Sequence, residues 1–95
     1  MSAQIILVGS LTFESIERLN REMSEQLSKL ADTTEVEVDL QQINEVDSSG
    51  VSFVCYWLRY MRQRQRVLSF RHAPTNLLSL MALYGVNEFL QAMIT

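Results

Sequence analysis

The amino-acid sequence predicts a small α/β domain in which an open, mixed or parallel sheet carries its helices mainly on one face. Residues 35–40 alternate strictly between acidic and apolar side chains, and residues 67–71 also alternate, so each segment is typical of a strand with one solvated face. Helical periodicity lies between these two strands, and that order forms a right-handed parallel crossover. The chain of 95 residues therefore predicts one domain, 1–95, with the element order β-α-β-α-β-α.

The first half of the chain predicts a strand followed by an amphipathic helix. Residues 4–8 form a short β-branched run that ends at Gly9 and Ser10. From Thr12 onward, apolar side chains recur at spacings of three and four, which is the period of a helix with one buried face. The apolar positions of this helix are Ile16, Leu19, Met23, Leu27 and Leu30.

The second half predicts two further helices and a less regular tail. One helix runs from about Ser49 to Arg64, between the two alternating strands. Another runs from about Thr75 to Tyr84, because Pro74 starts it and Gly85 occupies the usual position after a helix end. Residues 86–95 are apolar at several positions and fit either a last helix or an edge strand, of which we favour the helix.

Charge and cysteine content narrow the function classes. The net charge is −3, with ten of the eleven acids at or before Asp47 and five of the eight basic residues after it. A net negative charge argues against nucleic acid as a partner. The uneven distribution of acidic and basic residues produces an electric field that can steer the protein toward a partner. The single cysteine, Cys55, excludes an internal disulfide and predicts a small buried hydrophobe in a reducing compartment.

The expected location is the cytoplasm. No apolar run approaches the roughly 20 residues needed to span a bilayer. The start of the chain also lacks the basic region of a secretory signal.

Enzymatic activity, a cofactor and a metal site are not expected. The sequence contains no glycine-rich phosphate loop and no nucleophile beside a base, and the only histidine, His72, is expected in a loop. Carboxylates at Glu35, Glu37 and Asp39 are spaced by two along a strand, which predicts a solvated face opposite Arg71 rather than a metal site.

The most informative segment is Asp47-Ser48-Ser49-Gly50, where a strand exit meets a helix. Ser48 is predicted to cap the helix, its hydroxyl accepting a hydrogen bond from a free backbone N–H of the first turn. The same turn would accept a phosphoryl group, because its unpaired N–H groups and the positive helix end attract anions. A phosphoryl group there adds about −1.5 to −2 charges next to Asp47 and would repel an acidic partner surface.

These residues carry a family resemblance that covers nearly the whole chain. The run Val38-Asp39-Leu40, then Ile43 and Val46, then Asp47-Ser48-Ser49-Gly50, resembles the hallmark of STAS domains, the anti-sigma-factor antagonist fold. Residues 7–13 are similar to the strand-to-helix passage of the same family. In phosphoswitch members a partner kinase phosphorylates the serine after the aspartate, which the resemblance assigns to Ser48. Those members usually have an additional N-terminal strand, whereas the first strand expected here begins at about Gln4.

The C-terminal half, from Phe70 to Val86, looks more like the MlaB-type STAS subunit. The resemblance implies a cytoplasmic adaptor that binds the ATPase of the Mla phospholipid ABC transporter, which maintains outer-membrane lipid asymmetry in Gram-negative bacteria. In that branch Ser48 would contact the ATPase without being phosphorylated. The alternative is an anti-sigma-factor antagonist that is switched by phosphorylation of Ser48.

The helix after Asp47 also predicts a docking face. At about 100° per residue its apolar side chains Val51, Val54, Cys55, Leu58 and Met61 share one face, and its aromatic side chains gather on the opposite one. If the first face packs on the sheet, the aromatics face outward beside two arginines, a composition in which protein interfaces are enriched. Two alternatives stay open: the third helix or the tail covers the aromatics, or a rotated helix places them in the core.

The predicted partner-binding residues share this helix and its first turn: Asp47, Ser48, Ser49, Gly50, Phe53, Tyr56, Trp57, Arg59, Tyr60 and Arg64. The expected partner is a protein, either an ABC transporter ATPase or an anti-sigma kinase, and membrane association would be peripheral through that complex. Contact of the arginines with anionic lipid is a weaker hypothesis. The sequence also leaves open a homodimer through the aromatic side chains.

Overall fold

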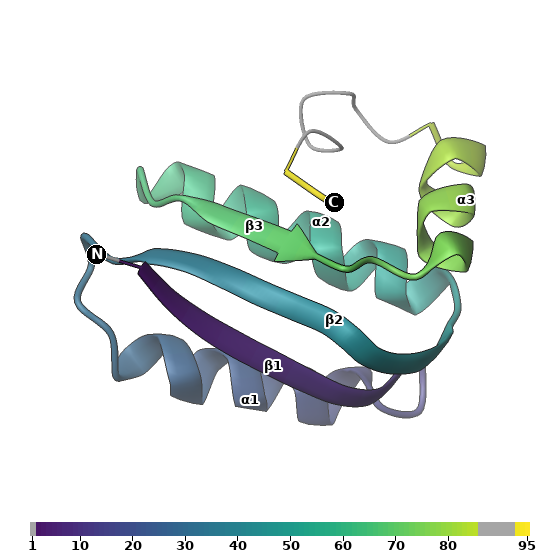
Figure 1. Cartoon of the computed structure of the whole chain (residues 1–95), viewed down its shortest axis with the longest axis horizontal. Helices are drawn as coiled ribbons and strands as arrows, with labels where there is room; N and C mark the ends of the chain where they lie inside the picture. Colours follow the sequence, from purple (N-terminus) through teal and green to yellow (C-terminus); the bar gives the residue numbers. More distant parts are fainter. Residues whose placement is uncertain (1, 86–92) are drawn as a thin grey trace.

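A computed structural model describes residues 2–85 and 93–95, and these form a parallel sheet covered by helices (Figure 1). The element order is the predicted one. The strands are β1 (Ser2–Leu11), β2 (Glu35–Val46) and β3 (Leu68–Arg71), and the helices are α1 (Ile16–Ser28), α2 (Ser48–Gln63) and α3 (Thr75–Leu83).

The three strands are all parallel and lie in the order β1-β2-β3. Residue Val38 of β2 pairs with Ile5 of β1 on one side and with Phe70 of β3 on the other. Because each crossover contains a helix, α1 and α2 lie side by side on the same face, behind the sheet in Figure 1. The prediction of a small open sheet with helices mainly on one face is confirmed.

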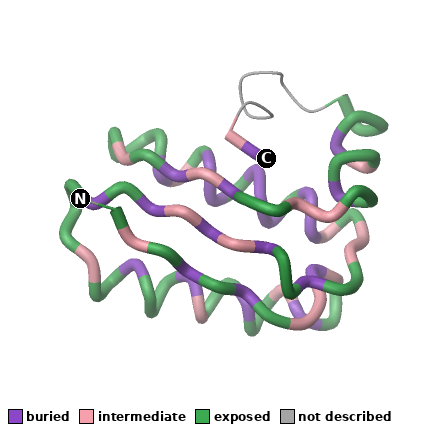
Figure 2. The backbone as a smooth tube through the Cα atoms, in the orientation of Figure 1, coloured by how far each residue is buried: buried purple, intermediate pink, exposed green. Residues whose placement is uncertain are grey.

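The core lies between this sheet and the two long helices (Figure 2). Leu19, Met23 and Leu27 of α1 are buried, as the predicted period of three and four requires. Cys55 of α2 is also buried among the hydrophobic side chains, and burial raises the pKa of its thiol. The prediction of a small buried hydrophobe at this position is confirmed.

The other face of the sheet is open to solvent. Glu37 and Arg71, on neighbouring strands, form an ion pair of 3.4 Å, as the alternating pattern predicted. His72 follows β3 in a positive-φ loop conformation, and its Nδ1 lies 3.1 Å from the Asp39 carboxylate. Ile6 and Val8 of β1 alternate with buried residues of the same strand, and both are about half exposed.

Helix α1 begins later than predicted. The sequence pattern starts a helix at Thr12, whereas residues 12–15 form a turn in which the N–H groups of Ser15 and Ile16 both donate to the Thr12 carbonyl, at 3.0 and 2.9 Å. The Thr12 N–H donates in turn to the Ser15 hydroxyl at 3.1 Å. Local side-chain hydrogen bonds of this kind compete with the helix and delay its start.

Two further boundaries concern the C-terminal part. Helix α3 begins directly after Pro74 and ends before Gly85, which adopts φ +66°, so the predicted start and stop signals are confirmed. The predicted tail helix falls mostly on residues 86–92, which lie outside the described residues. Of the described end, Ile94 forms a parallel bridge with Phe70, so these last residues pair with β3 as an edge strand would.

No helix within residues 2–85 and 93–95 combines the length and apolar character needed to cross a membrane.

Candidate functional site

Asp47 joins the carboxyl end of the sheet to the start of α2. Its Oδ1 accepts a hydrogen bond from the Ser49 N–H at 2.8 Å, and its Oδ2 accepts one from the Phe13 N–H at 3.0 Å. Its own N–H donates to the Leu11 carbonyl at 3.1 Å. One side chain therefore ties the turn before α1 to the first turn of α2.

These hydrogen bonds hold Asp47 in its charged form. The Phe13 N–H contributes most to lowering the pKa of the carboxyl group below its ordinary value, and the Ser49 N–H, its hydroxyl and the Gly50 N–H act in the same direction. Desolvation opposes this shift without reversing it. The carboxylate is thus occupied in holding the turn and is not placed as a proton acceptor for chemistry.

The prediction that Ser48 caps α2 is wrong. Asp47 has the extended backbone of an N-cap residue and accepts the Ser49 N–H, whereas Ser48 is already the first residue of the helix. A carboxylate one residue earlier reaches that N–H in the geometry that a helix cap requires. Ser48 is consequently an exposed residue with no part in the cap.

Gly50 was predicted to contact a partner, but it is buried in the structure. A Cβ at this position would lie 2.7 Å from the Leu11 carbonyl oxygen and 2.9 Å from Val46 Cγ1. The lack of a side chain is therefore needed where the first turn of α2 crosses the ends of β1 and β2. Its neighbour Ser49 is half-buried and lines a cleft described below.

The predicted outward aromatic face is only partly present. Phe53 and Trp57 are 2% and 4% exposed and belong to the core, while Tyr56 is exposed and Tyr60 is half-buried. The reason is α1, which lies beside α2 and covers one flank of it, so that α2 buries side chains against both the sheet and a helix. Trp57 Nε1 donates to Asn20 Oδ1 of α1 at 2.9 Å, which satisfies the buried indole.

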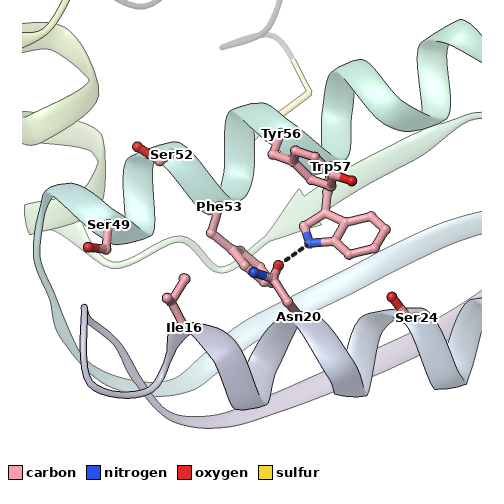
Figure 3. Close-up of a pocket in the computed structure, with 8 residues that line it drawn as sticks. All are labelled: Ile16, Asn20, Ser24, Ser49, Ser52, Phe53, Tyr56 and Trp57. Carbon is pink, nitrogen blue, oxygen red and sulfur yellow. Dashed lines mark hydrogen bonds between the residues drawn. The ribbon is translucent and has the colours of Figure 1, made fainter.

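A cleft of about 530 Å³ lies between α1 and α2 (Figure 3). Apolar and aromatic side chains alternate there with hydroxyl and amide groups. The lining residues are Ile16, Asn20, Ser24, Ser49, Ser52, Phe53, Tyr56 and Trp57. The small exposed parts of Phe53 and Trp57 therefore face the cleft, and the exposed Tyr56 lies at its edge.

The basic end of α2 lies beyond Tyr56. The guanidinium carbon of Arg64 lies 3.6 Å from the centre of the Tyr60 ring, and Arg64 Nη1 donates to the Tyr60 carbonyl at 3.2 Å. The Tyr60 ring in turn lies 6.0 Å from that of Tyr56, in a stacked arrangement. Arg59 is exposed on the same helix. The structure therefore brings Tyr56, Arg59, Tyr60 and Arg64 together on one side of α2.

Sequence reasoning missed Phe13, which is exposed beside the Asp47 carboxylate. A helix beginning at Thr12 would have put Phe13 three residues before Ile16, on the buried face. Because α1 begins only at Ile16, the turn directs this side chain outward. The hydroxyl-rich sequence Ser10-Leu11-Thr12 before it was the available signal for such a turn.

The described residues offer no metal site of grouped side chains. Within residues 2–85 and 93–95, no three His, Cys, Asp or Glu side chains are grouped closely enough to hold a metal ion. The site consists instead of exposed hydroxyl, aromatic and guanidinium groups around a shallow cleft, which are suited to binding another molecule.

Comparison with known proteins agrees with this fold. No curated protein matches the chain closely enough to establish a relationship. A family model described as "Mlab, STAS domain" matches residues 2–94, which is nearly the whole chain. The parallel three-stranded sheet and its helices are consistent with that match. The chain belongs to the MlaB-like STAS domain family.

Proposed function

We propose that this chain is a non-enzymatic adaptor subunit that docks on the ATPase of an Mla-type phospholipid ABC transporter. The observation that supports this most directly is the exposed surface along α2, where Tyr56 borders the cleft between α1 and α2 and where Phe13 and Ser48 are exposed at the turn that starts the helix. Family membership directs the choice of partner. The proposal implies a cytoplasmic protein held at the inner membrane through the transporter, with a role in outer-membrane lipid asymmetry.

The chemistry of this surface fits protein docking. Aromatic side chains supply large contact areas with few rotatable bonds and are enriched among the residues that dominate binding energy. The cleft beside Tyr56 is lined by apolar and aromatic side chains together with hydroxyl and amide groups, so an inserted side chain would find both packing and hydrogen bonds. Asp47 keeps the turn fixed, which reduces the ordering cost of binding.

The test is a binding titration of the chain with the Mla-type ATPase of the same organism. Tyr56→Ala should weaken binding by about tenfold or more, as expected for an interface aromatic. Tyr84→Ala is the matched control, because Tyr84 at the end of α3 is 57% exposed and Tyr56 is 56% exposed. Equal affinities of wild type and Tyr56→Ala would remove this surface from the proposal.

A second pair of variants tests the turn before α1. Phe13→Ala should also weaken binding, while Leu83→Ala should not, although the two side chains are 79% and 76% exposed. The two substitutions remove similar exposed apolar groups at distant places in the fold. A loss of affinity in both variants would indicate non-specific hydrophobic attachment and contradict a defined docking site.

A second candidate function is the phosphorylation switch of an anti-sigma-factor antagonist. The exposed hydroxyl of Ser48 in the first turn of α2 favours it, since a phosphoryl group there would meet the positive helix end. Incubation with the organism's anti-sigma kinase and ATP should then phosphorylate the wild type and leave Ser48→Ala unmodified, as read by mass spectrometry. An unmodified wild-type chain would exclude this candidate.

A further inference from the structure

The docking surface of α2 contains two hollows with different chemistry, which meet at Tyr56 and Ser52. The cleft between α1 and α2 is lined by uncharged residues. The second hollow, of about 620 Å³, lies along α2 itself and contains two cations. Its lining residues are Val51, Ser52, Cys55, Tyr56, Arg59, Tyr60, Gln63 and Arg64.

The two arginines of this second hollow carry uncompensated charge. Within residues 2–85 and 93–95, neither Arg59 nor Arg64 forms an ion pair with a carboxylate. Arg64 is fixed over Tyr60, and Asp32 is the acidic group that shares a neighbouring hollow with it. Along the sequence, residues 48–85 contain five arginines and no acid.

The turn from which α2 starts is acidic. A hollow around Phe13 is lined by Glu14, Glu45 and Asp47, at the turn where α2 begins. The docking surface therefore changes sign along α2, from negative beside its first residue to positive near its last turns. A partner that covers the whole surface must match both signs, and this fixes its direction as well as its place.

We infer that the partner's docking element is an acidic amphipathic segment, which places an apolar side chain in the cleft and carboxylates over Arg59 and Arg64. This inference rests on the proposed function. Arg59 follows Phe53 by six positions, which is about 9 Å along a helix. The segment therefore carries its apolar residue and its first acid about one to two helical turns apart.

A protein segment fits this surface better than an anionic lipid bilayer. Polybasic attraction to membranes uses clusters of about four to eight cations. Residues 59–66 contain four arginines, the lower limit of that range, and two of them, Arg59 and Arg64, line this hollow. The acidic groups around Phe13 lie at the turn where α2 begins and would be repelled by anionic headgroups. The uncharged cleft between the two ends accepts a side chain rather than a headgroup array.

The experiment measures affinity for the same ATPase at about 50 and 300 mM salt. The screening length shortens over this range, which weakens the attraction between exposed charges much more than the attraction between buried ones. The double variant Arg59→Gln/Arg64→Gln should bind about tenfold more weakly at low salt and lose most of the salt dependence. Arg71→Gln is the matched control, because Arg71 is an exposed arginine on the open sheet face. Its affinity should equal that of the wild type.

The outcomes separate the two proposals. Wild-type binding that is insensitive to salt and to the double variant would overturn the acidic segment and leave the docking site standing. Failure of the wild type to bind the ATPase would overturn both. Attachment to phosphatidylcholine vesicles containing phosphatidylglycerol, abolished by the double variant, would overturn the inference in favour of a lipid ligand. Folding of each variant is checked by the emission of Trp57, the only tryptophan.

Discussion

At the scale of single residues, Asp47 caps helix α2 and Ser48, the next residue, is exposed. Asp47→Ala removes the acceptor of both the Ser49 and Phe13 N–H groups. We expect it to lower the free energy of unfolding by about 1–2 kcal/mol. Ser48→Ala should change it by less than about 0.5 kcal/mol, since an exposed hydroxyl is lost. Urea unfolding of the two variants checks this, and the reverse order would restore Ser48 as the cap.

The same carboxylate predicts a dependence of stability on pH. The pKa of Asp47 in the folded chain lies below its ordinary value of 3.8, so the folded state favours the charged form. This stabilisation is fully present above the unfolded pKa and is lost as the pH falls through the folded one. Asp47→Asn should therefore flatten the fall of stability between about pH 4 and pH 2. A residual slope is expected from Asp39, whose pKa is also lowered, chiefly by the Gln41 N–H.

The close packing around Gly50 can be tested by adding a side chain at this position. Gly50→Ala should lower the free energy of unfolding by about 1–2 kcal/mol, because the clash with the Leu11 carbonyl outweighs the better helix propensity of alanine. Ser52→Ala, an exposed substitution one half-turn later in α2, is the control and should be close to neutral. A stabilised Gly50→Ala variant in chemical denaturation would mean that the crossing of α2 over β1 is looser than described.

At the scale of elements, the sequence predicted which elements form but not how the two long helices meet. The buried face of α1 and the strands β2 and β3 followed from side-chain periodicity, and β1 followed from a short β-branched run that ends at Gly9. In α2, however, the arc of buried residues includes Phe53 and Trp57 as well as Val54 and Leu58. A helical period gives the direction of one apolar face, whereas the second face of α2 exists only because α1 lies beside it. That adjacency is a tertiary fact with no local signal.

The contact between these helices is testable through Trp57. Asn20→Ala removes the acceptor of the buried indole N–H, which should cost about 0.5–1.5 kcal/mol of stability. It should also shift the fluorescence emission of this only tryptophan, because water reaches the indole edge. Ser24→Ala, on the same cleft wall, is the control. Unchanged emission in Asn20→Ala would contradict the hydrogen bond.

At the scale of the whole molecule, β2 is the centre of the structure. It pairs with β1 and β3 and is covered by helices on one face, so its amides should open only in global unfolding. We expect hydrogen exchange to be slowest at Val36 and Val38, which pair with both neighbouring strands, and faster in α3, which contributes only two fully buried side chains. Equal protection in α3 and β2 would contradict this ranking.

The topology of the whole chain also explains which residues of the candidate site could be predicted from the sequence. The sequence placed Tyr56, Arg59, Tyr60 and Arg64 correctly on one helix and one side, because their spacing sets their direction. It could not place Phe13 with them, because Phe13 lies 34 positions before Asp47 in the chain. Only the parallel crossover returns the chain to the same edge of the sheet and brings these two residues together.

The separation of the cap from the hydroxyl has an evolutionary consequence. Asp47 supplies the side-chain cap of α2, so selection for stability acts on position 47. The residue at position 48 is then free to change under selection for partner binding. A lineage could exchange the serine for threonine, or for a residue that no kinase modifies, without first acquiring a compensating mutation. Partner choice and thermodynamic fitness can therefore drift independently at adjacent positions of one turn.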